Sequence, residues 1–144
     1  MGLNKGQLLA TRVHAAVYRA TNGRLGGTLG HIEQVLLTTT GRTSGQQRTT
    51  PLAATRDGDR LILIASNNGG DRHPAWYLNL VAHPEIVVQV RGERIAMMAR
   101  VAEGEERKEG WRKAVAMNPG YARYESRTTR RIPVIVCERA PVAP

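Results

Sequence analysis

Short β-strand patterns joined by tight turns constrain the fold of this chain most strongly. Most of these patterns are rich in β-branched residues, which favour a pleated and half-buried backbone. Asp57 and Gly58 separate two of the patterns and have the composition of a type I′ hairpin turn. Six strands are predicted, at 32–40, 47–56, 60–66, two within 85–103 on either side of Gly92 and Glu93, and 131–139.

Helical patterns occupy much of the remaining sequence. Trp111, Ala114 and Val115 recur with a period near 3.6 residues and are expected to face inward from an amphipathic helix. Pro74 is expected at the first helical position of a shorter helix. The predicted helices span 7–20, 73–83, 104–117 and, after a turn, part of 118–127.

The order of these elements predicts an antiparallel fold. Short strands joined by hairpins favour an antiparallel sheet, and six of them are enough to curl into a small barrel. Strands and helices do not alternate regularly, which argues against a doubly wound parallel sheet. We therefore expect a mainly β, six-stranded barrel with flanking helices, formed by 31–144 as one domain, and a helical extension over 1–30.

Charge and missing motifs narrow the chemistry. The net charge of +9 favours an acidic partner. The sequence contains no dinucleotide or P-loop fingerprint, no zinc-ligand spacing and no serine hydrolase elbow, so we expect no metal and little acid–base machinery. A bound cofactor would then supply the reactive atom. The single cysteine, Cys137, lies in an apolar strand pattern and is expected to be buried and inert.

The stretch 36–52 ("LLTTTGRTSGQQRTTPL") has the residue types of an anion-binding loop. Gly41 and Gly45 allow backbone N–H groups to come close to a ligand, and Arg42 and Arg48 offer planar donors for phosphate or carboxylate oxygens. Glycine, serine and threonine are also ordinary turn residues, so a polar hairpin loop explains the same stretch equally well.

Three motifs together resemble the deazaflavin-dependent nitroreductase family. They are "LLTTTGRTSGQQRTTPL", "ASNNGGDRHPAWYLNL" and "PGYARYESRTTRRIPVIVCE", and the likeness extends from Gln34 to Glu138. The resemblance implies coenzyme F420 as cofactor and a split β-barrel of the type that binds flavin mononucleotide. It also implies transfer of a hydride from the reduced deazaflavin to a small electron-poor acceptor, such as a quinone, an α,β-unsaturated carbonyl or a nitro compound.

The resemblance also implies a set of site residues. Ser66, Tyr121 and Tyr124 would orient or polarise the acceptor, so they are the implied catalytic residues. Thr43 and Asn67 occupy positions where relatives commonly carry a basic residue, and Asn118 replaces a tyrosine of the relative that activates nitroimidazoles. The implied cofactor-binding residues are Arg42, Thr43, Ser44, Gly45, Gln46, Arg48, Pro51, Ala65, Ser66, Asn67, Pro74, Trp76 and Asn79.

Other functions stay open at this point. The same barrel could bind flavin mononucleotide, carry the deazaflavin without turnover, or act as a basic module for anionic membranes or nucleic acid. Aromatic residues make up only 4% of the chain, which argues against nucleic acid. No secretory signal or membrane span is visible, so a cytoplasmic protein is expected. Lys5, Arg12 and Arg19 flank the apolar stripe of 7–20, so this helix either contacts the inner face of the membrane or docks on the barrel.

Overall fold

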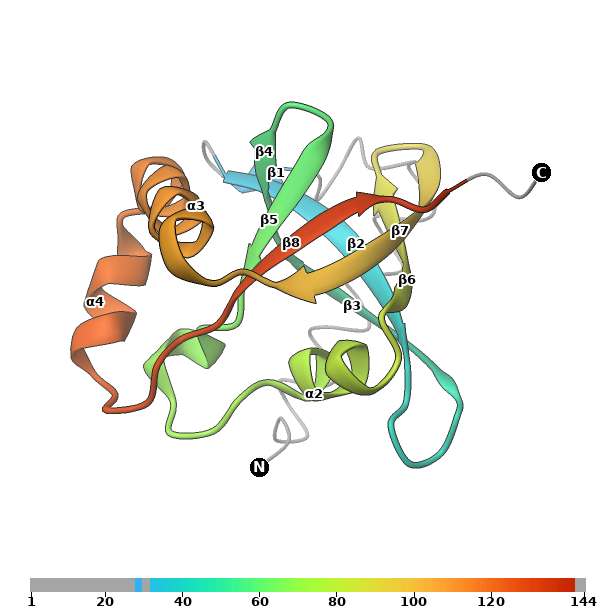
Figure 1. Cartoon of the computed structure of the whole chain (residues 1–144), viewed down its shortest axis with the longest axis horizontal. Coiled ribbons are helices and arrows are strands. Elements are labelled where there is room, and N and C mark those ends of the chain that lie inside the picture. The colour runs from blue at the N-terminus through green and yellow to red at the C-terminus, as the bar shows by residue number, and fades with distance from the viewer. Residues whose placement is uncertain (1–27, 30–31, 142–144) are drawn as a thin grey trace.

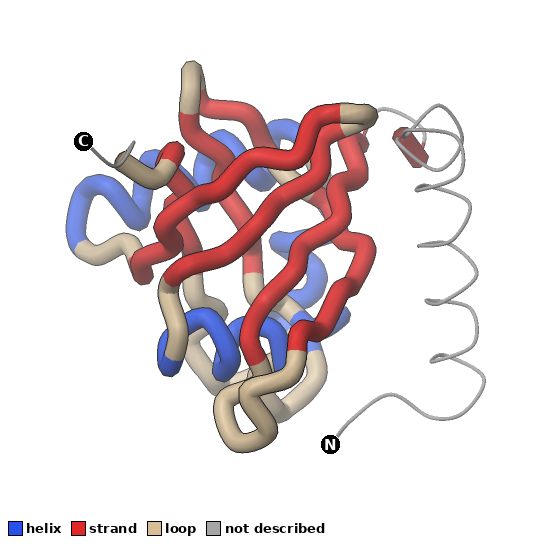
Figure 2. Tube along the Cα trace, turned by 90° about the vertical axis from the view of Figure 1, so that its right-hand side faces the viewer, coloured by secondary structure: helices blue, strands red, loops and turns tan. Residues whose placement is uncertain are grey.

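The computed structural model describes residues 28–29 and 32–141. The helix predicted over 7–20, and with it the expected membrane contact, lies outside these residues. The described part forms one curled antiparallel sheet with helices around it (Figure 1). A tube view from the side shows the strands crossing one another at a steep angle, as they do in a sheet that bends back on itself (Figure 2).

Eight strands make up this sheet. Every pair of neighbouring strands is antiparallel, and the order along the sheet is β1-β2-β6-β7-β8-β5-β4, with β3 paired to β2. The strands are β1 (Thr28–Leu29), β2 (Ile32–Thr40), β3 (Gln47–Ala53), β4 (Thr55–Asp57), β5 (Arg60–Ile64), β6 (Glu85–Val90), β7 (Glu93–Val101) and β8 (Val134–Arg139).

The expected count of six strands was too low. The single strand predicted over 47–56 is divided at Ala54, because β3 pairs with β2 while β4 pairs with β5 at the other end of the sheet. Ala54 is fully buried, and its N–H donates to the carbonyl of Glu33 at 3.0 Å. The two-residue β1 adds the eighth strand, and without it the curled sheet has seven. At Ala54 the chain therefore passes from the β2 end of the sheet to the β5 end.

Two turn details differ from the sequence-based expectation. Asp57 pairs with Arg60, so Gly58 and Asp59 are the central residues of the hairpin. Gly58 has a φ of 61° at the first central position, as a type II′ turn requires, whereas a type I′ turn was expected with Asp57 and Gly58 in the centre. The strand predicted over 60–66 ends at Ile64, so Ser66 lies beyond the sheet.

Three α-helices and one 3-10 turn are described. Pro74 was expected at the first helical position. Its ψ of 151° is extended, and Pro74 is the N-cap of the helix, which begins one residue later at Ala75. None of these helices combines the length and the apolar character needed to cross a membrane. The elements are η1 (Asn67–Gly69), α2 (Ala75–Ala82), α3 (Gly104–Met117) and α4 (Gly120–Ser126).

The buried side chains of the described residues form two clusters. The larger cluster fills the inside of the curled sheet and contains Leu37, Leu63 and Cys137. Cys137 is buried, as expected, and burial raises the pKa of its thiol to about 12. The second cluster lies between the sheet and helices α3 and α4, where Ala114 is buried and Trp111 and Val115 pack against it, as predicted.

Candidate functional site

The loop between β2 and β3 is closed by its own backbone. The N–H of Gly41 donates to the carbonyl of Gln46 at 2.7 Å, and the N–H of Gly45 donates to the carbonyl of Gly41 at 2.9 Å. Ser44 Oγ accepts a hydrogen bond from the N–H of Gln46 at 3.1 Å. Gly45 has a φ of 70°, a conformation that glycine adopts without strain. The loop is therefore a compact turn whose side chains point outward.

A buried amide joins this loop to helix α2. The N–H of Arg42 donates to Asn79 Oδ1 at 3.1 Å, and Asn79 Nδ2 donates to Thr39 Oγ1 at 3.2 Å. The Asn79 side chain is nearly buried, its bond to Thr39 is buried, and its bond to Arg42 is partly buried. Asn79 was expected to contact a cofactor. Its described partners show that it fixes the orientation of the loop relative to α2.

The exposed side chains of the loop form a cationic surface. Between Gln34 and Arg56 the sequence contains no aspartate or glutamate. Glu33, just before this stretch, forms a bidentate ion pair with Arg56 at 2.8 Å. An anion at the loop would therefore meet uncompensated positive charge. The predicted cofactor contacts that are exposed here are Arg42, Thr43, Ser44, Gly45, Gln46 and Arg48.

The segment that follows β5 has an unusual backbone. Asn67, Asn68 and Gly69 have positive φ values of 47°, 55° and 78° in succession. The N–H of Gly69 donates to the carbonyl of Ser66, and the N–H of Gly70 donates to the carbonyl of Asn67, both at 2.9 Å. Left-handed conformations of residues other than glycine cost energy and persist where the surroundings impose them. This segment must therefore be held by contacts from elsewhere.

Arg130 supplies those contacts. Its Nε donates to the carbonyl of Gly70 at 2.9 Å, its Nη1 to the carbonyl of Ala65 at 3.1 Å, and its Nη2 to the carbonyl of Ser66 at 2.7 Å. Nη1 also lies 3.1 Å from His73 Nδ1. The sequence analysis did not identify Arg130, because it is one of several arginines in 123–131 and no motif sets it apart.

Ser66 carries a hydroxyl that is available to a ligand. The residue is only 7% exposed, and no hydrogen bond from its hydroxyl is formed within the described chain. Every buried side-chain nitrogen or oxygen of the described residues has a partner, so this hydroxyl must retain access to solvent. Neighbouring Asn67 instead donates its side-chain amide to the carbonyl of Arg72 at 3.0 Å. Of these two predicted contacts, Ser66 has the freer donor.

The two predicted tyrosines lie at different depths. Tyr121 is buried in the second cluster, 6.4 Å from the Trp111 ring and 6.3 Å from the Tyr124 ring, and burial raises its pKa. Tyr124 is half-buried at the surface of α4. Helix α4 packs directly on η1, since a Cβ on Gly69 would lie 3.0 Å from the Tyr124 carbonyl oxygen. The structure thus places Tyr124 next to the segment that carries Ser66.

The remaining predicted contacts belong to α2, to β3 and to the end of β5. Pro74 caps α2, Trp76 packs half-buried against the larger core cluster, Ala65 is fully buried, and Pro51 pairs with Leu36 in the sheet. The loop, α2 and η1 follow one another along the lower end of the molecule in Figure 1. This arrangement offers cations at one side and a hydroxyl donor at the other. It suits an elongated ligand with an acidic end.

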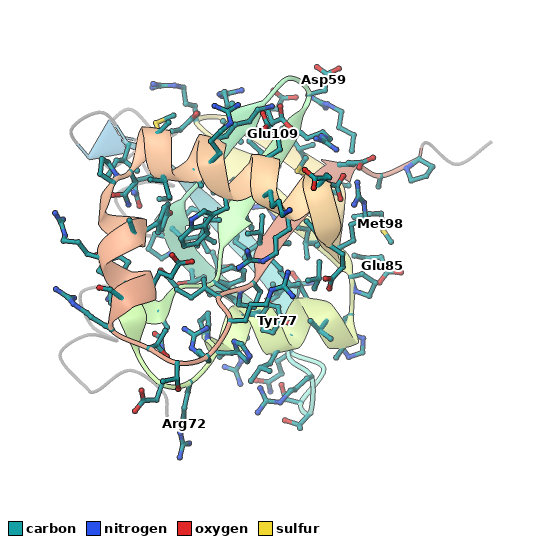
Figure 3. The ribbon with its side chains drawn as sticks, turned by 60° about the vertical axis from the view of Figure 1, so that its left-hand side comes forward. Asp59, Arg72, Tyr77, Glu85, Met98 and Glu109 are labelled. Carbon is teal, nitrogen blue, oxygen red and sulfur yellow. The ribbon has the colours of Figure 1, made fainter. Side chains whose placement is uncertain are left out.

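A cavity of about 160 Å³ lies between α2, the end of β7 and the start of α3. Tyr77 lines it, and Tyr77 points from α2 toward the segment that leads into β8, whereas Arg72 extends into solvent (Figure 3). Tyr77 and Asn79 are two residues apart on a helix and therefore face nearly opposite directions. The cavity is thus separate from the cationic loop. No group of three metal-ligating side chains comes together anywhere in the described ranges.

Sequence comparison finds relatives over most of the chain. Residues 10–139 match the sequence profile of the F420H(2)-dependent quinone reductase family. A curated F420H(2)-dependent quinone reductase of Mycobacterium tuberculosis is 39% identical over 132 residues, which cover 89% of this chain and 89% of the relative.

Solved structures agree with this comparison. An F420-H2 dependent reductase superposes with a TM-score of 0.69 at 40% identity, covering 73% of this chain and 93% of the other. A second structure, described as a domain-swapped dimer, superposes with a TM-score of 0.72 at 33% identity and covers 92% of this chain and 98% of the other.

Proposed function

The chain belongs to the F420H(2)-dependent quinone reductase family, and on this premise we propose that it transfers a hydride from reduced coenzyme F420 to a quinone or a similar electron-poor acceptor. The observation that carries the proposal is the cationic loop joined by Asn79 to α2, together with the Ser66 hydroxyl, for which the described residues supply no hydrogen-bond partner. We further propose that the curled sheet is a split barrel of the type that binds flavin mononucleotide. The superposition at a TM-score of 0.69 supports this fold.

The residues present fit the cofactor at its acidic end. Arg42 and Arg48 are exposed cations on a rigid loop, and Ser44 and the backbone near Gly45 add polar donors. Guanidinium groups bind phosphate and carboxylate through charge-assisted hydrogen bonds, so these residues would hold the anionic part. Thr43 lies on the same exposed turn, and its hydroxyl is a weaker anion donor than the basic residue of relatives.

The ring end of the cofactor would lie toward Pro51, Ala65 and Pro74. Bound there, the reduced cofactor supplies a hydride. Ser66 would donate its free hydroxyl to the oxygen of the acceptor and stabilise the negative charge that develops on it. Tyr124 is less buried than Tyr121 and its carbonyl packs against η1, so it is the tyrosine that would assist or supply the proton.

Two substitutions relative to the family bear on the range of acceptors. Ala75 is smaller than the methionine of some relatives, which enlarges the space at the start of α2. Asn118 replaces a tyrosine and uses its side-chain oxygen to accept the N–H of Gly120 at 3.0 Å. We therefore expect quinones and cyclic enones to be better acceptors than nitroimidazoles.

A titration tests the cofactor. Purified protein is titrated calorimetrically with oxidised coenzyme F420, flavin mononucleotide and a nicotinamide cofactor. We expect F420 to bind in preference to the other two. If the protein binds flavin mononucleotide and not F420, and shows an absorbance band at about 450 nm, it is a flavin-binding protein and the F420 proposal is wrong.

A turnover assay tests the reaction. Oxidation of reduced F420 is followed under anaerobic conditions with menadione as acceptor, and protein-free reactions serve as controls. Turnover supports the proposal. A protein that binds the cofactor and oxidises it with none of menadione, a cyclic enone or a nitroaromatic compound would be a carrier, and the enzyme proposal would be abandoned.

Contact with an anionic membrane surface is a separate proposal about the sequence before the described residues. Lys5, Arg12 and Arg19 flank the apolar stripe of that segment. We expect co-sedimentation with anionic liposomes at low salt and its loss after removal of 1–25. If the full-length protein stays in the supernatant at low salt, the membrane proposal is wrong and the alternative, a helix that docks on the barrel, is kept.

A further inference from the structure

We infer that Arg130 is a positioning residue, which holds the backbone from Ala65 to His73 in the shape that the ring end of the cofactor site requires. The inference rests on the proposed function, because it assigns that site a structural support. Arg130 itself is not proposed to contact the cofactor or the acceptor. It acts through the main chain that carries Ser66.

The contacts of Arg130 converge on one short segment from far along the chain. Three of its nitrogens donate to three different carbonyls, at distances between 2.7 and 3.1 Å. These carbonyls belong to Ala65, Ser66 and Gly70, which lie on both sides of the left-handed run. A planar guanidinium presents its donors in a fixed fork, so it sets the positions of these carbonyls relative to one another.

The geometry of the segment explains why a support is needed. Asn67 and Asn68 adopt left-handed conformations that cost non-glycine residues energy. Two backbone hydrogen bonds lie within the turn, the N–H of Ala65 donates to the carbonyl of Pro133 at 3.0 Å, and the Asn67 side chain donates to the carbonyl of Arg72 at 3.0 Å. None of these bonds joins the carbonyls before the turn to the carbonyl after it. Arg130 bonds to residues before and after the turn and so prevents the ends from spreading. Loss of these bonds would let Ser66 move relative to α2.

Arg130 also fixes the neighbouring histidine. Because a guanidinium has no acceptor, His73 Nδ1 must accept its hydrogen bond, and the ring proton must reside on Nε2. Burial first, and the positive charge of Arg130 second, lower the pKa of His73, which keeps the ring neutral at pH 7. The His73 ring lies 4.7 Å from the Tyr77 ring on α2. Arg130 therefore links the Ser66 segment to the start of α2.

Lysine cannot replace this arrangement. Its donors radiate from a single nitrogen, so they cannot match three carbonyls that are arranged around a planar fork. Arg130→Lys preserves the charge and most of the side-chain volume while it removes the fork. The adjacent Arg131 offers a matched control, since its side chain is 66% exposed and its described ion pair is a 3.9 Å contact with Glu103.

The first experiment measures the free protein. Hydrogen–deuterium exchange is followed in the parent, Arg130→Lys, Arg130→Ala and Arg131→Lys proteins without ligand. We expect faster exchange within 66–73 in both Arg130 variants and parent-like exchange in the β2–β3 loop. Parent-like exchange of 66–73 in Arg130→Lys would overturn the inference. This measurement does not depend on the proposed function.

The second experiment measures binding of oxidised F420 by fluorescence titration. The loss of a hydrogen-bond set that involves a charged group predicts a dissociation constant about ten- to a hundredfold higher in Arg130→Lys. Arg131→Lys should bind like the parent. Added methylguanidinium should restore binding to Arg130→Ala, which a global loss of structure would not allow.

The outcomes separate the two claims. If the parent binds F420 and Arg130→Lys binds it equally well, the inference fails and the proposed function stands. If the parent does not bind F420 at all, the proposed function fails, and with it the role of Arg130 toward the cofactor. In turnover assays we expect a higher KM for reduced F420 in Arg130→Lys, and a lower kcat with menadione, because the same segment carries Ser66. An unfolding midpoint is recorded for each variant, so that only folded protein is compared.

Discussion

The backbone N–H of Arg42 and the side-chain oxygen of Asn79 lie 3.1 Å apart, and this hydrogen bond joins two elements that are 37 residues apart in the sequence. The second bond of the same side chain, to Thr39, anchors it to the end of β2. A ligand that spans the loop and α2 would therefore meet a surface whose two halves are already set. Less conformational freedom is then lost on binding.

Replacing Asn79 tests this connection. Asn79→Ala leaves the N–H of Arg42 and the hydroxyl of Thr39 without their partner, which should lower the free energy of unfolding by about 1–3 kcal/mol. F420 should also bind more weakly, because the loop is no longer held against α2. Urea denaturation and an F420 titration measure the two effects. Ser126→Ala, which also removes a hydrogen bond to the backbone, should leave F420 binding unchanged. Parent-like values for Asn79→Ala in both measurements would contradict the prediction.

Arg48 and Arg42 should contact the acidic part of the cofactor. A lost charge-assisted hydrogen bond costs about 1.5–3 kcal/mol, so Arg48→Ala should bind F420 about ten- to a hundredfold more weakly. The loss should shrink at high salt, which screens exposed charges. Arg94→Ala removes the same charge from the β6–β7 hairpin and serves as the control. An unchanged dissociation constant for Arg48→Ala at low salt would remove the loop from the site.

Ser66→Ala should slow the reaction without weakening cofactor binding. Its hydroxyl is proposed to act on the acceptor, which binds after F420. Removal of one donor to developing charge costs about a hundred- to a thousandfold in a well-formed oxyanion site, and we expect about tenfold in this more solvent-accessible one. Anaerobic oxidation of reduced F420 by menadione measures the rate. A parent-like rate would remove Ser66 from the reaction.

The two tyrosines should differ in the same assay. Tyr124→Phe should lower the rate, because Tyr124 is half-buried beside the Ser66 segment. Tyr121→Phe should affect the rate less, because Tyr121 is packed against Trp111 in the core. A larger loss of rate in Tyr121→Phe would show that its hydroxyl reaches the acceptor after all, as the resemblance implies.

Acid should destabilise the network of ion pairs beside α3. Hydrogen bonds from Lys113 and from Arg60 hold the pKa of Asp57 below its ordinary value of 3.8, and Arg100 first and Arg60 second lower the pKa of Glu106 below 4.5. Folded carboxylates then bind fewer protons than unfolded ones, so the stability is complete above these ordinary values and is lost as the pH falls below them. Urea denaturation between pH 7 and pH 3 measures this loss. Asp57→Asn should show a shallower loss, and an equally steep one would exclude Asp57 as a contributor.

Cys137 should react only when the protein unfolds. The thiol is fully buried with a pKa of about 12, so almost no thiolate exists at neutral pH. Labelling with iodoacetamide at pH 8 should be slow in the folded protein and fast in urea. Fast labelling without denaturant would mean that the β7–β8–β5 region opens easily.

The sequence predicted the positions of the strands and helices better than it predicted how the strands pair to form the curled sheet. The positions of β2, β6, β7 and α3 follow from hydrophobic periodicity, and the structure agrees. The sequence around Ala54 does not indicate that the strand ends there, because alanine fits a continuous strand as well as a point where the chain changes its pairing partner. Likewise, Asp57 and Gly58 indicated a hairpin correctly, but the register that decides the turn type comes from the pairing of Asp57 with Arg60.

The family resemblance was confirmed, and it reached further than the residues alone. It assigned cofactor and acceptor roles to the loop and the Ser66 segment, which periodicity and composition left open, and these roles stay predictions. Arg130 could not be found in this way. Its importance arises from three carbonyls that lie about sixty residues earlier in the chain, at separations of 60 to 65. Backbone acceptors have no sequence signature, so only the folded structure shows that one arginine among several is bound to them.

The position of β8 has a consequence for biosynthesis. β8 lies between β5 and β7 and pairs with both, so neither of these strands has its second neighbour until 134–139 have been made. During synthesis the hairpins β2–β3, β4–β5 and β6–β7 can form early, because each joins strands that are close in sequence. The sheet itself can close only after the last strand leaves the ribosome. Nascent chains that stall before Val134 should therefore expose two unpaired strand edges and be the species that chaperones recognise.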